Sequence, residues 1–353
     1  MNAAIQILSK AVEGARISAD EAVRLFEEAE LIELGLAADA VCRRLHPEPF
    51  RTYVVDRNIN YTNICVSGCR FCAFYRDADS PEAYLLSNDE IYEKIEEAVA
   101  LGATQILVQG GLHPDLDISY YERLVRGVKE RFQVHLHSLS PPEIVHVAGV
   151  SGLTIADAIA RLKAAGLDSI PGGGAEILTD AARGNLSPSK CTTREWLEVM
   201  ETAHRLGVPT TATMMFGHIE SFADRVEHLV EIRELQDRTG GFTAFIPWTF
   251  QPANTRLGGQ AVGGYDYLHT LAISRLVLDN FSNIQASWVT QGDKIGQVAL
   301  HFGANDLGST MIEENVVAAA GVGFHMSEQE LRQAIGEAGY IPRRRDTYYR
   351  LLE

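Results

Sequence analysis

Cysteine is scarce in this chain, and the few cysteines present are unevenly placed. Only 5 of the 353 residues are cysteine, and three of them, Cys65, Cys69 and Cys72, lie close together. An odd number of cysteines, most of them in one short stretch, is not typical of the disulfide framework of a secreted domain. The scarcity therefore excludes a disulfide scaffold and directs attention to the triplet.

Basic residues and long apolar runs are also lacking. The chain has 31 Lys and Arg against 47 Asp and Glu, a formal net charge of −16, whereas sequence-independent nucleic-acid binding needs a basic face. No run approaches the roughly 18–20 apolar residues that cross a bilayer, and no basic and apolar leader opens the chain. We expect a cytoplasmic protein that binds neither nucleic acid nor a membrane.

The cysteine triplet has the spacing C-x3-C-x2-C. Thiolates are soft ligands that favour iron–sulfur clusters, zinc or copper(I), and a four-iron cluster usually takes four cysteines. Three thiolates would leave one iron open to bind a substrate or cofactor. A zinc site completed by a distant His is the alternative. Chance clustering of buried cysteines is disfavoured because Ser67, Gly68 and Arg70 are typical of a loop.

Most of the chain alternates between short β-branched runs and amphipathic helices. With 46% hydrophobic residues, 353 residues can form one large domain or two ordinary ones. We expect strands at 52–55, 104–108, 134–137, 167–170, 209–215, 242–246 and 284–288. The expected helices that alternate with these strands cover 89–100, 120–131, 155–165, 193–206, 222–238 and 267–280. Gly102, Gly166 and Gly207 follow three of these helices and predict their ends.

This order predicts an α/β fold, a (β/α) TIM-type barrel of six to eight βα units. Residues 1–50 are expected to form two helices, the first preceded by a capping box at Ser18–Glu21. We place the barrel at 51–310 and expect 311–353 to be a helical segment packed on it. The basic run Arg343–Arg345 is expected to be solvated, and Cys42 and Cys191 are expected to have no role beyond packing.

Polar and glycine-rich loops follow the expected strands, where a barrel has its active site. The cysteine loop follows the first strand, and Gln109–His113 follows the second. Residues 138–143, 171–176, 216–218 and 247–252 follow the next four. All these loops should meet at one mouth of the barrel.

The cysteine loop, with Phe71 before its last cysteine, resembles that of the radical S-adenosylmethionine (SAM) superfamily. Within it, five passages resemble the dehypoxanthine futalosine cyclases of the futalosine route to menaquinone: 56–63, 109–115, 168–177, 242–252 and 286–292. The passages span roughly residues 50–345. Their relatives, the aminofutalosine synthases and deazaflavin (FO) synthases, share much of the same pattern.

The resemblance implies a 4Fe–4S cluster on Cys65, Cys69 and Cys72, with SAM on the open iron and a flavodoxin or ferredoxin as electron donor. It implies hydrogen abstraction from the 4′ carbon of the ribose of dehypoxanthine futalosine, followed by radical addition to the aromatic ring. The product would be cyclic dehypoxanthine futalosine. The protein's share of such a reaction is positioning and the exclusion of water and oxygen.

Several residues are then candidates for holding the cofactor. Gly110 and Gly111 match the glycine pair of the superfamily, whose backbone can meet the SAM amino group; a tight βα turn is the alternative. Glu176 is a candidate acceptor for the SAM ribose hydroxyls, unless it is a structural residue paired with an Arg such as Arg183. The other cofactor-binding candidates are Phe71, Gln109 and Ser140.

Four histidines, at 113, 135, 137 and 218, lie near strand ends and could accept the proton lost in the reaction. His218 and His113 rank first, with Tyr61 as a further catalytic candidate; a hydrogen-bonded structural role is the alternative for each. The candidates for substrate contacts are Gly173, Gly174, Arg183, Trp248 and Asn305. Close backbone approach competes with a flexible turn at the glycines, and stacking competes with core packing at Trp248. The 171–174 run lacks both the P-loop and the dinucleotide-binding pattern.

The sequence leaves three functions open. The first is the radical cyclase. The second is a sibling radical SAM enzyme, such as an aminofutalosine or FO synthase. The third is a non-enzymatic metal-binding protein whose cysteine triplet holds zinc or a storage cluster.

Overall fold

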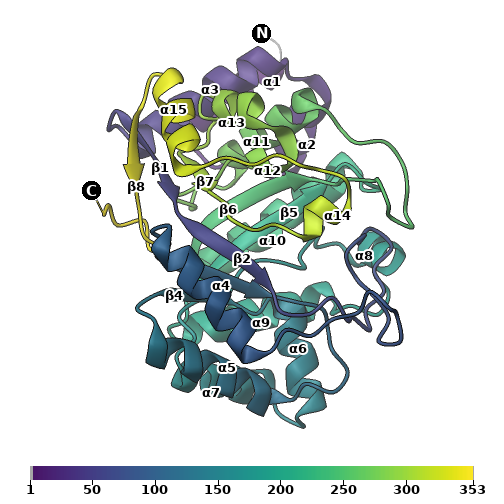
Figure 1. Ribbon diagram of the computed structural model, residues 1–353. Coiled ribbons are helices and arrows are strands. Elements are labelled where there is room, and N and C mark those ends of the chain that lie inside the picture. The colour runs from purple at the N-terminus through teal and green to yellow at the C-terminus, as the bar shows by residue number, and fades with distance from the viewer. Residues whose placement is uncertain (1–2, 353) are drawn as a thin grey trace.

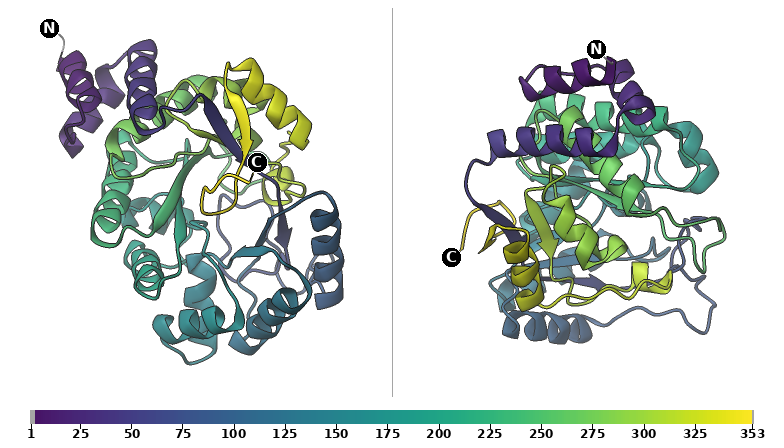
Figure 2. Two further views of the ribbon diagram at one scale, coloured as in Figure 1. Left: turned by 90° about the vertical axis from the view of Figure 1, so that its left-hand side faces the viewer. Right: turned by 90° about the horizontal axis from the view of Figure 1, so that it is seen from above.

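The computed structural model describes residues 3–352, which form a parallel barrel with helices around it (Figure 1). Three helices precede the barrel: α1 (Ala3–Val12), α2 (Ala19–Glu28) and α3 (Leu31–Leu45). Two had been expected here. The capping box at Ser18 is present at the start of α2, where the Ser18 side chain accepts from the Glu21 amide. The three helices lie together beside the barrel (Figure 2).

The barrel wall contains β1 (Phe50–Val54), β2 (Asp56–Asn60), β3 (Gln105–Gln109), β4 (His135–Ser138), β5 (Thr210–Phe216), β6 (Phe242–Thr249) and β7 (Asp306–Ser309). Every pairing between them is parallel. Single bridges at 169–170 and 284–285 connect β4 to β5 and β6 to β7. With β1 and β2 forming one bent strand, the wall has eight positions around the ring (Figure 2). The α/β barrel is confirmed.

The helices that cover the wall are α4 (Asn88–Ala100), α5 (Ile118–Arg131), α6 (Pro141–Val150), α7 (Ile155–Ala165), α9 (Thr193–Arg205), α10 (Phe222–Thr239) and α11 (Gly264–Val277). Their apolar faces form one continuous core with the outer face of the wall. The short helix α8 (Asp180–Leu186) lies beside the loop that follows β2, where the Leu186 carbonyl accepts from the Arg70 amide (Figure 1). Gly102, Gly166 and Gly207 follow α4, α7 and α9 with φ of +92°, +117° and +71°. Only glycine enters that region readily, so the helix ends predicted from these glycines are correct.

The C-terminal part differs most from expectation. After α12 (Trp288–Gln291), α13 (Asp293–Ala299), α14 (Val316–Ala319) and α15 (Glu328–Glu337), the chain adds a strand, β8 (Ile341–Arg344). β8 pairs in parallel with β1, in register from Phe50 and Ile341 onward. The segment after 310 therefore contributes to the sheet and is not purely helical. The strand expected at 284–288 is reduced to a bridge because α12 begins at Trp288.

The expectation of a solvated basic run at Arg343–Arg345 holds for Arg343, which is exposed, and is wrong for Arg344 and Arg345. Arg345 is 4% exposed and forms an ion pair with Asp306, with Nε to Oδ2 at 2.5 Å. Arg344 donates to the Gly102 carbonyl. Arg345 thus neutralises a buried carboxylate, and Arg344 bonds a backbone carbonyl, at one end of the barrel.

Among the described residues no single helix is long and apolar enough to cross a membrane. The pair α6 and α7 passes that test together by length and composition, with a bend of 104° between them.

Candidate active site

A cavity of about 410 Å³ occupies the interior of the barrel. At the carboxyl ends of the strands it is lined by loops that we call the mouth: residues 65–72, 110–111 and 173–176. At the amino ends it is lined by Asp56, Gln105, Arg345, Thr347 and Tyr349. These residues, with Asp306, are called the floor. Because barrel active sites form at the carboxyl ends of strands, the mouth is the expected place for chemistry.

The three cysteines Cys65, Cys69 and Cys72 all line the cavity from the loop between β2 and α4. All three are free thiols. The loop is held by its own backbone and by Arg76, whose side chain donates to the carbonyls of Ala73, Phe74 and Tyr75. The sequence therefore brings the triplet to the mouth on a rigid loop.

Burial disfavours the charged form of Cys65 and Cys72. It raises the pKa of Cys72 to about 11, against opposing hydrogen bonds from backbone amides, and it also raises the pKa of Cys65. Thiols must lose their protons to bind a metal, so metal binding here is coupled to proton release. Within residues 3–352, no group of three or more His, Cys, Asp or Glu side chains lies close enough to hold a single metal ion.

The glycine pair packs directly against this loop. A Cβ at Gly110 would lie 2.7 Å from the Tyr61 ring, and a Cβ at Gly111 would collide with the Ile64 carbonyl and approach the Cys65 Cβ to 2.9 Å. Both positions line the cavity. Glycine is thus needed here for close approach of the cysteine loop, and the same feature leaves the backbone bare toward the cavity.

A second glycine run lies across the mouth. At Gly173 a Cβ would come within 2.6 Å of the Gln109 side-chain nitrogen, and Gly174 has φ of +75°. Gly173, Gly174 and Gln109 all line the cavity, as predicted positions for ligand contact. The carbonyl of Gly173 accepts from Trp196 Nε1 at 3.3 Å, so the run is anchored from outside the barrel.

Glu176 lies at the mouth in the left-handed region, with φ of +45°. Its carboxylate accepts from Lys190 Nζ at 2.5 Å, and both side chains line the cavity. Burial alone would lower the pKa of Lys190, but the Glu176 carboxylate outweighs it and the pKa is raised. Lys190 Nζ also lies 5.2 Å from the Phe71 ring centroid. The sequence had suggested Arg183 as a partner for Glu176; the partner is Lys190.

Arg183 and Asn305, two predicted substrate contacts, lie away from the cavity lining. Arg183 is buried and donates to backbone carbonyls of Gly174, Ala175 and Cys191. Asn305 accepts from Arg275 and from the Ile284 amide. Their hydrogen bonds fix the mouth loop and the 284–285 bridge respectively, which is a supporting role.

Ser140 and Trp248 do line the cavity. Ser140 donates to Glu143 at 2.6 Å in the capping box of α6. The same Glu143 accepts from the Gly110 amide and from the Tyr61 hydroxyl, each at 3.0 Å. Tyr61 is fully buried, bonded also to Tyr121, and is outside the cavity lining. Its position supports the glycine pair from behind.

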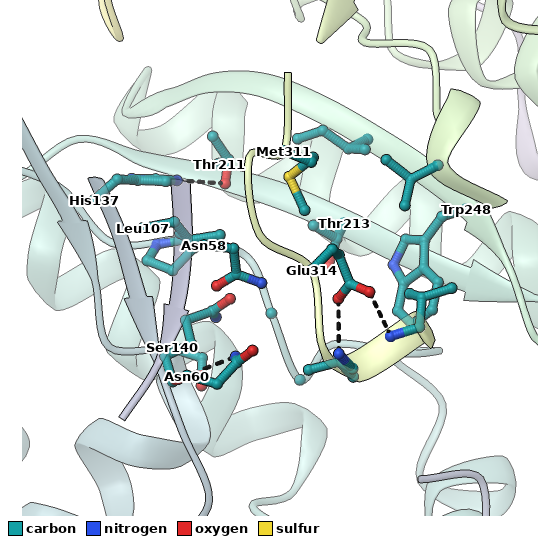
Figure 3. Close-up of a pocket in the computed structure, with 18 of the residues that line it drawn as sticks. Asn58, Asn60, Leu107, His137, Ser140, Thr211, Thr213, Trp248, Met311 and Glu314 are labelled. Atoms are coloured by element: carbon teal, nitrogen blue, oxygen red, sulfur yellow. Dashed lines mark hydrogen bonds between the residues drawn. The ribbon is translucent and has the colours of Figure 1, made fainter. Parts of the chain in front are cut away.

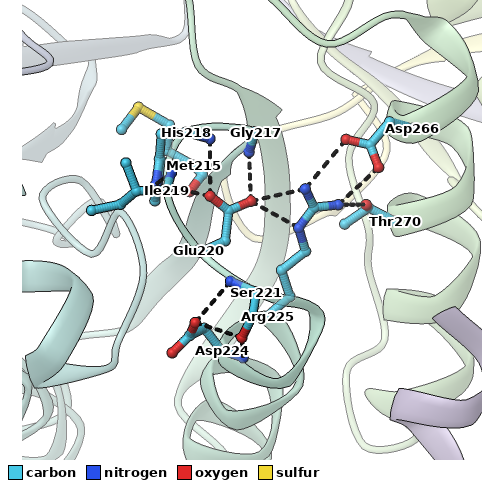
Figure 4. Close-up of polar contacts among 10 residues, drawn as sticks. All are labelled: Met215, Gly217, His218, Ile219, Glu220, Ser221, Asp224, Arg225, Asp266 and Thr270. Atoms are coloured by element: carbon cyan, nitrogen blue, oxygen red, sulfur yellow. Dashed lines mark hydrogen bonds and ion pairs between the residues drawn. The ribbon is translucent and has the colours of Figure 1, made fainter. Parts of the chain in front are cut away.

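His218 and His113, the first-ranked catalytic candidates, also lie outside the cavity lining. His218 is enclosed in a polar cluster in which Glu220 bridges His218 Nδ1, at 2.8 Å, and Arg225 (Figure 4). His113 Nδ1 accepts from the Asp115 amide within its own loop. Sequence position near a strand end did not reveal which way either ring faces.

His137 is the histidine that lines the cavity (Figure 3). Its Nε2 lies 3.3 Å from Thr211 Oγ1, and its Nδ1 lies 2.6 Å from Ser169 Oγ. The same hydroxyl is 2.6 Å from His135 Nε2. Burial lowers the pKa of His137 to about 3 and that of His135 to about 4, so both rings are neutral near pH 7.

Sequence reasoning missed two further lining residues, Asn58 and Asn60 on β2 (Figure 3). A buried strand normally carries apolar side chains on its core face, so amides at alternate positions of the run Asp56–Asn60 were a usable signal. Glu314 was missed as well. Its carboxylate accepts from the amides of Val316 and Val317 at the start of α14, beside the cavity.

Comparisons with known proteins agree with this geometry. Residues 59–232 match the radical SAM superfamily, and residues 239–353 match the CofH/MqnC C-terminal region. The cyclic dehypoxanthine futalosine synthases of Halalkalibacterium halodurans and Streptomyces coelicolor are each 47% identical over 98% of this chain. The alignments cover 94% and 88% of those proteins.

A protein with a different name is similar to the same degree. The 5-amino-6-(D-ribitylamino)uracil--L-tyrosine 4-hydroxyphenyl transferase of Archaeoglobus fulgidus is 47% identical over 86% of this chain and 89% of its own. Two solved structures share the fold at 17% identity. They are the FeFe-hydrogenase maturase HydG from Carboxydothermus hydrogenoformans (TM-score 0.77, 98% of this chain, 80% of that chain) and methylornithine synthase PylB (TM-score 0.75, 95% and 97%).

Proposed function

This chain belongs to the CofH/MqnC family of the radical SAM superfamily, and from that premise we propose that it converts dehypoxanthine futalosine to cyclic dehypoxanthine futalosine in menaquinone biosynthesis. The reaction removes the hydrogen on ribose C4′ and joins that carbon to the aromatic ring. The observation that carries the proposal is the near-full-length identity of 47% to two synthases of that name. The arrangement of the cavity supports it.

The residues at the mouth fit the cofactors of the superfamily. Cys65, Cys69 and Cys72 would hold a 4Fe–4S cluster and leave one iron for SAM. When bound, these groups supply a 5′-deoxyadenosyl radical by reductive cleavage of SAM. The bare backbone of Gly110 and Gly111 would accept the SAM amino group, and Glu176 would accept its ribose hydroxyls, with Lys190 orienting that carboxylate.

The chain's own task is to position the substrate and keep water out. At the floor Arg345 is paired with Asp306 and Gln105 with Asp56, whereas the mouth is lined by glycine backbone and thiols. The wall between mouth and floor combines Trp248 with hydroxyl and amide side chains, a mixture suited to an aromatic ring joined to a sugar.

We assign the proton lost from the aromatic ring to His137. His137 accepts this proton at Nε2 and gives its Nδ1 proton to the Ser169 hydroxyl. Ser169 in turn gives its own proton to His135 Nε2, so that His137 stays neutral; both transfers follow contacts of 2.6 Å. The ring electron that leaves with the proton goes to a one-electron carrier. A catalytic role for His113, His218 or Tyr61 stays a prediction, and the position of each outside the cavity lining does not favour it.

A second candidate is transfer of a 4-hydroxyphenyl group from tyrosine to 5-amino-6-(D-ribitylamino)uracil. The relative from Archaeoglobus fulgidus with that name has the same identity of 47%, over 86% rather than 98% of this chain. The two functions differ in substrate, so a substrate assay separates them.

The deciding experiment starts with anaerobic reconstitution, which we expect to give about four irons per chain. SAM and dithionite should then yield 5′-deoxyadenosine. With dehypoxanthine futalosine, mass spectrometry should show a product lighter by two hydrogens. Product from tyrosine and 5-amino-6-(D-ribitylamino)uracil instead would select the transferase, and zinc without iron would remove both.

The physiological electron donor is proposed to be a flavodoxin or ferredoxin, and the protein is proposed to act in the cytoplasm without nucleic acid or membrane. The support is its acidic charge of −16 and the one-electron chemistry. Reduction of the reconstituted protein by purified flavodoxin, followed by its absorbance, tests the first part.

A further inference from the structure

Asn58 and Asn60 present two unused hydrogen-bond acceptors to the cavity. They are 5% and 3% exposed and line the cavity from the inner face of β2 (Figure 3). Within residues 3–352, neither Asn58 Oδ1 nor Asn60 Oδ1 has a hydrogen-bond partner. Buried polar atoms are nearly always paired, so two unpaired acceptors on one wall need an explanation.

The orientation of Asn60 is fixed by its other side-chain atom. Asn60 Nδ2 donates to the Gln109 carbonyl at 3.2 Å on the neighbouring strand. The amide nitrogen is therefore occupied and the oxygen is left over. Asn58 stands two residues earlier, so its side chain projects to the same face.

The two positively charged side chains that line the cavity are already paired and do not serve these oxygens. Lys190 is bound to Glu176 and Arg345 to Asp306, both at 2.5 Å. At Asn60, whose nitrogen is occupied, a carboxylate or phosphate would meet the oxygen acceptor to acceptor, whereas a hydroxyl can donate to either oxygen and also accept from Asn58 Nδ2. The matching ligand groups are hydroxyl or N–H donors.

Depth in the barrel separates Asn58 from the residues assigned to SAM. Asn60 is in register with Gln109, and Asn58 is in register with Leu107, further from the glycine pair. The cysteine loop, Gly110, Gly111 and Glu176 all lie beyond the strand ends. Asn58 thus faces the interior, where the substrate would lie, below the residues assigned to SAM.

We propose that Asn58 and Asn60 form a recognition site for the hydroxyl groups of the pentose-derived part of the substrate. Two residues along a strand span about 6.6 Å, so the amides meet two different donors rather than share one. This inference rests on the proposed function for the identity of the ligand. The ribose of dehypoxanthine futalosine and the ribityl chain of the alternative substrate both offer such hydroxyls.

A chemical double-mutant cycle tests the proposal by binding rather than turnover. Dehypoxanthine futalosine and its 2′-deoxy and 3′-deoxy analogues are titrated into the reconstituted protein and into Asn58→Ala and Asn60→Ala. Wild type should bind at least one deoxy analogue about 3- to 10-fold more weakly than the parent compound. Each alanine variant should weaken the parent by a similar factor and lose the discrimination against one analogue.

Two further variants separate recognition from damage. Asn58→Asp keeps an acceptor oxygen in place and should keep the discrimination. Thr213→Val alters a lining hydroxyl that donates to the Gly172 carbonyl at 2.7 Å; any loss of affinity should be equal for parent and analogues. Thermal melting followed by circular dichroism confirms that each variant is folded.

The outcomes distinguish this inference from the function it rests on. Wild-type binding of dehypoxanthine futalosine, with discrimination unchanged in both alanine variants, overturns the hydroxyl site and leaves the function. Binding only of 5-amino-6-(D-ribitylamino)uracil, with discrimination against its deoxy analogue lost in the variants, overturns the function and supports the site. Binding of neither compound overturns both.

Discussion

The two ends of the barrel are built on opposite plans. At the floor most polar side chains bond each other: Arg345 binds Asp306, Gln105 donates to Asp56 at 2.7 Å, and Thr347 donates to Gln105 at 2.6 Å. The mouth is built from glycines and a cysteine loop, whose ligand-binding atoms have few partners in the chain. One end stabilises the fold, and the other is left open for ligands. Substitutions at the two ends should therefore fail in different ways.

The largest effect is expected from Cys69→Ser at the mouth. A missing thiolate removes a cluster ligand, so iron content and SAM cleavage should fall to background, at least about 100-fold. The melting temperature of the metal-free protein should stay within a few degrees of wild type. Full SAM cleavage by this variant would contradict the assignment of the triplet. Cys42→Ser, at a cysteine outside the cavity lining, is the control.

At the floor, Arg345→Met should cost stability rather than chemistry. It leaves Asp306, which is fully buried, without its counter-charge, and breaking a buried pair costs about 3–5 kcal/mol. Urea denaturation monitors the free energy of unfolding. The matched control is Arg205→Met, which breaks an exposed pair with Glu201 and should cost about 0–1 kcal/mol. Equal effects of the two would show that the floor is not a stabilising element.

Gly111→Ala should impair the mouth and also lower the stability of the fold. The new methyl group meets the Ile64 carbonyl and the Cys65 Cβ, which displaces the cysteine loop. Iron content after reconstitution should fall several-fold, while the free energy of unfolding falls by about 1–3 kcal/mol. Gly336→Ala is the control, because nothing lies within 4 Å of its added Cβ and the site is an exposed helical position. It should be neutral or stabilising by about 0.5–1 kcal/mol.

His137→Gln should lower the yield of cyclic product much more than it lowers the cleavage of SAM. Loss of the proton acceptor should lower formation of the cyclic product about 100-fold. 5′-Deoxyadenosine formation should fall much less, so the ratio of the two products is the measurement. A parallel fall in both would place His137 in binding rather than proton transfer.

The smallest effect is the dependence of stability on acid. Burial depresses the pKa of His137 to about 3 in the folded protein, below its value of about 6.5 in the unfolded chain. The unfolded state therefore binds the proton first, and stability falls as pH drops below about 6.5 toward 3. Between pH 6 and 5, His137→Gln should lose roughly 1 kcal/mol less than wild type in urea denaturation. No difference in slope would contradict the depressed pKa.

The sequence predicted the barrel and the residues whose chemistry is fixed by type and spacing. Cys65, Cys69 and Cys72 needed only their pattern, and Gly102 and Gly166 needed only their place after a helix. His218 and His137 were equivalent in sequence because each lies near a strand end. Only the three-dimensional packing turns one ring toward Glu220 and the other toward the cavity. Arg345 was misjudged because its counter-charge, Asp306, lies elsewhere in the chain.

The pairing of β8 with β1 also has a consequence for how the protein is made. β1 is translated early, yet its partner Ile341–Arg344 comes from the far end of the sequence. Until β8 emerges from the ribosome, the edge of β1 that β8 will cover has unpaired backbone groups, and these can pair with another chain. Contacts so distant in sequence slow folding. Nascent chains should therefore depend on chaperones until late in synthesis.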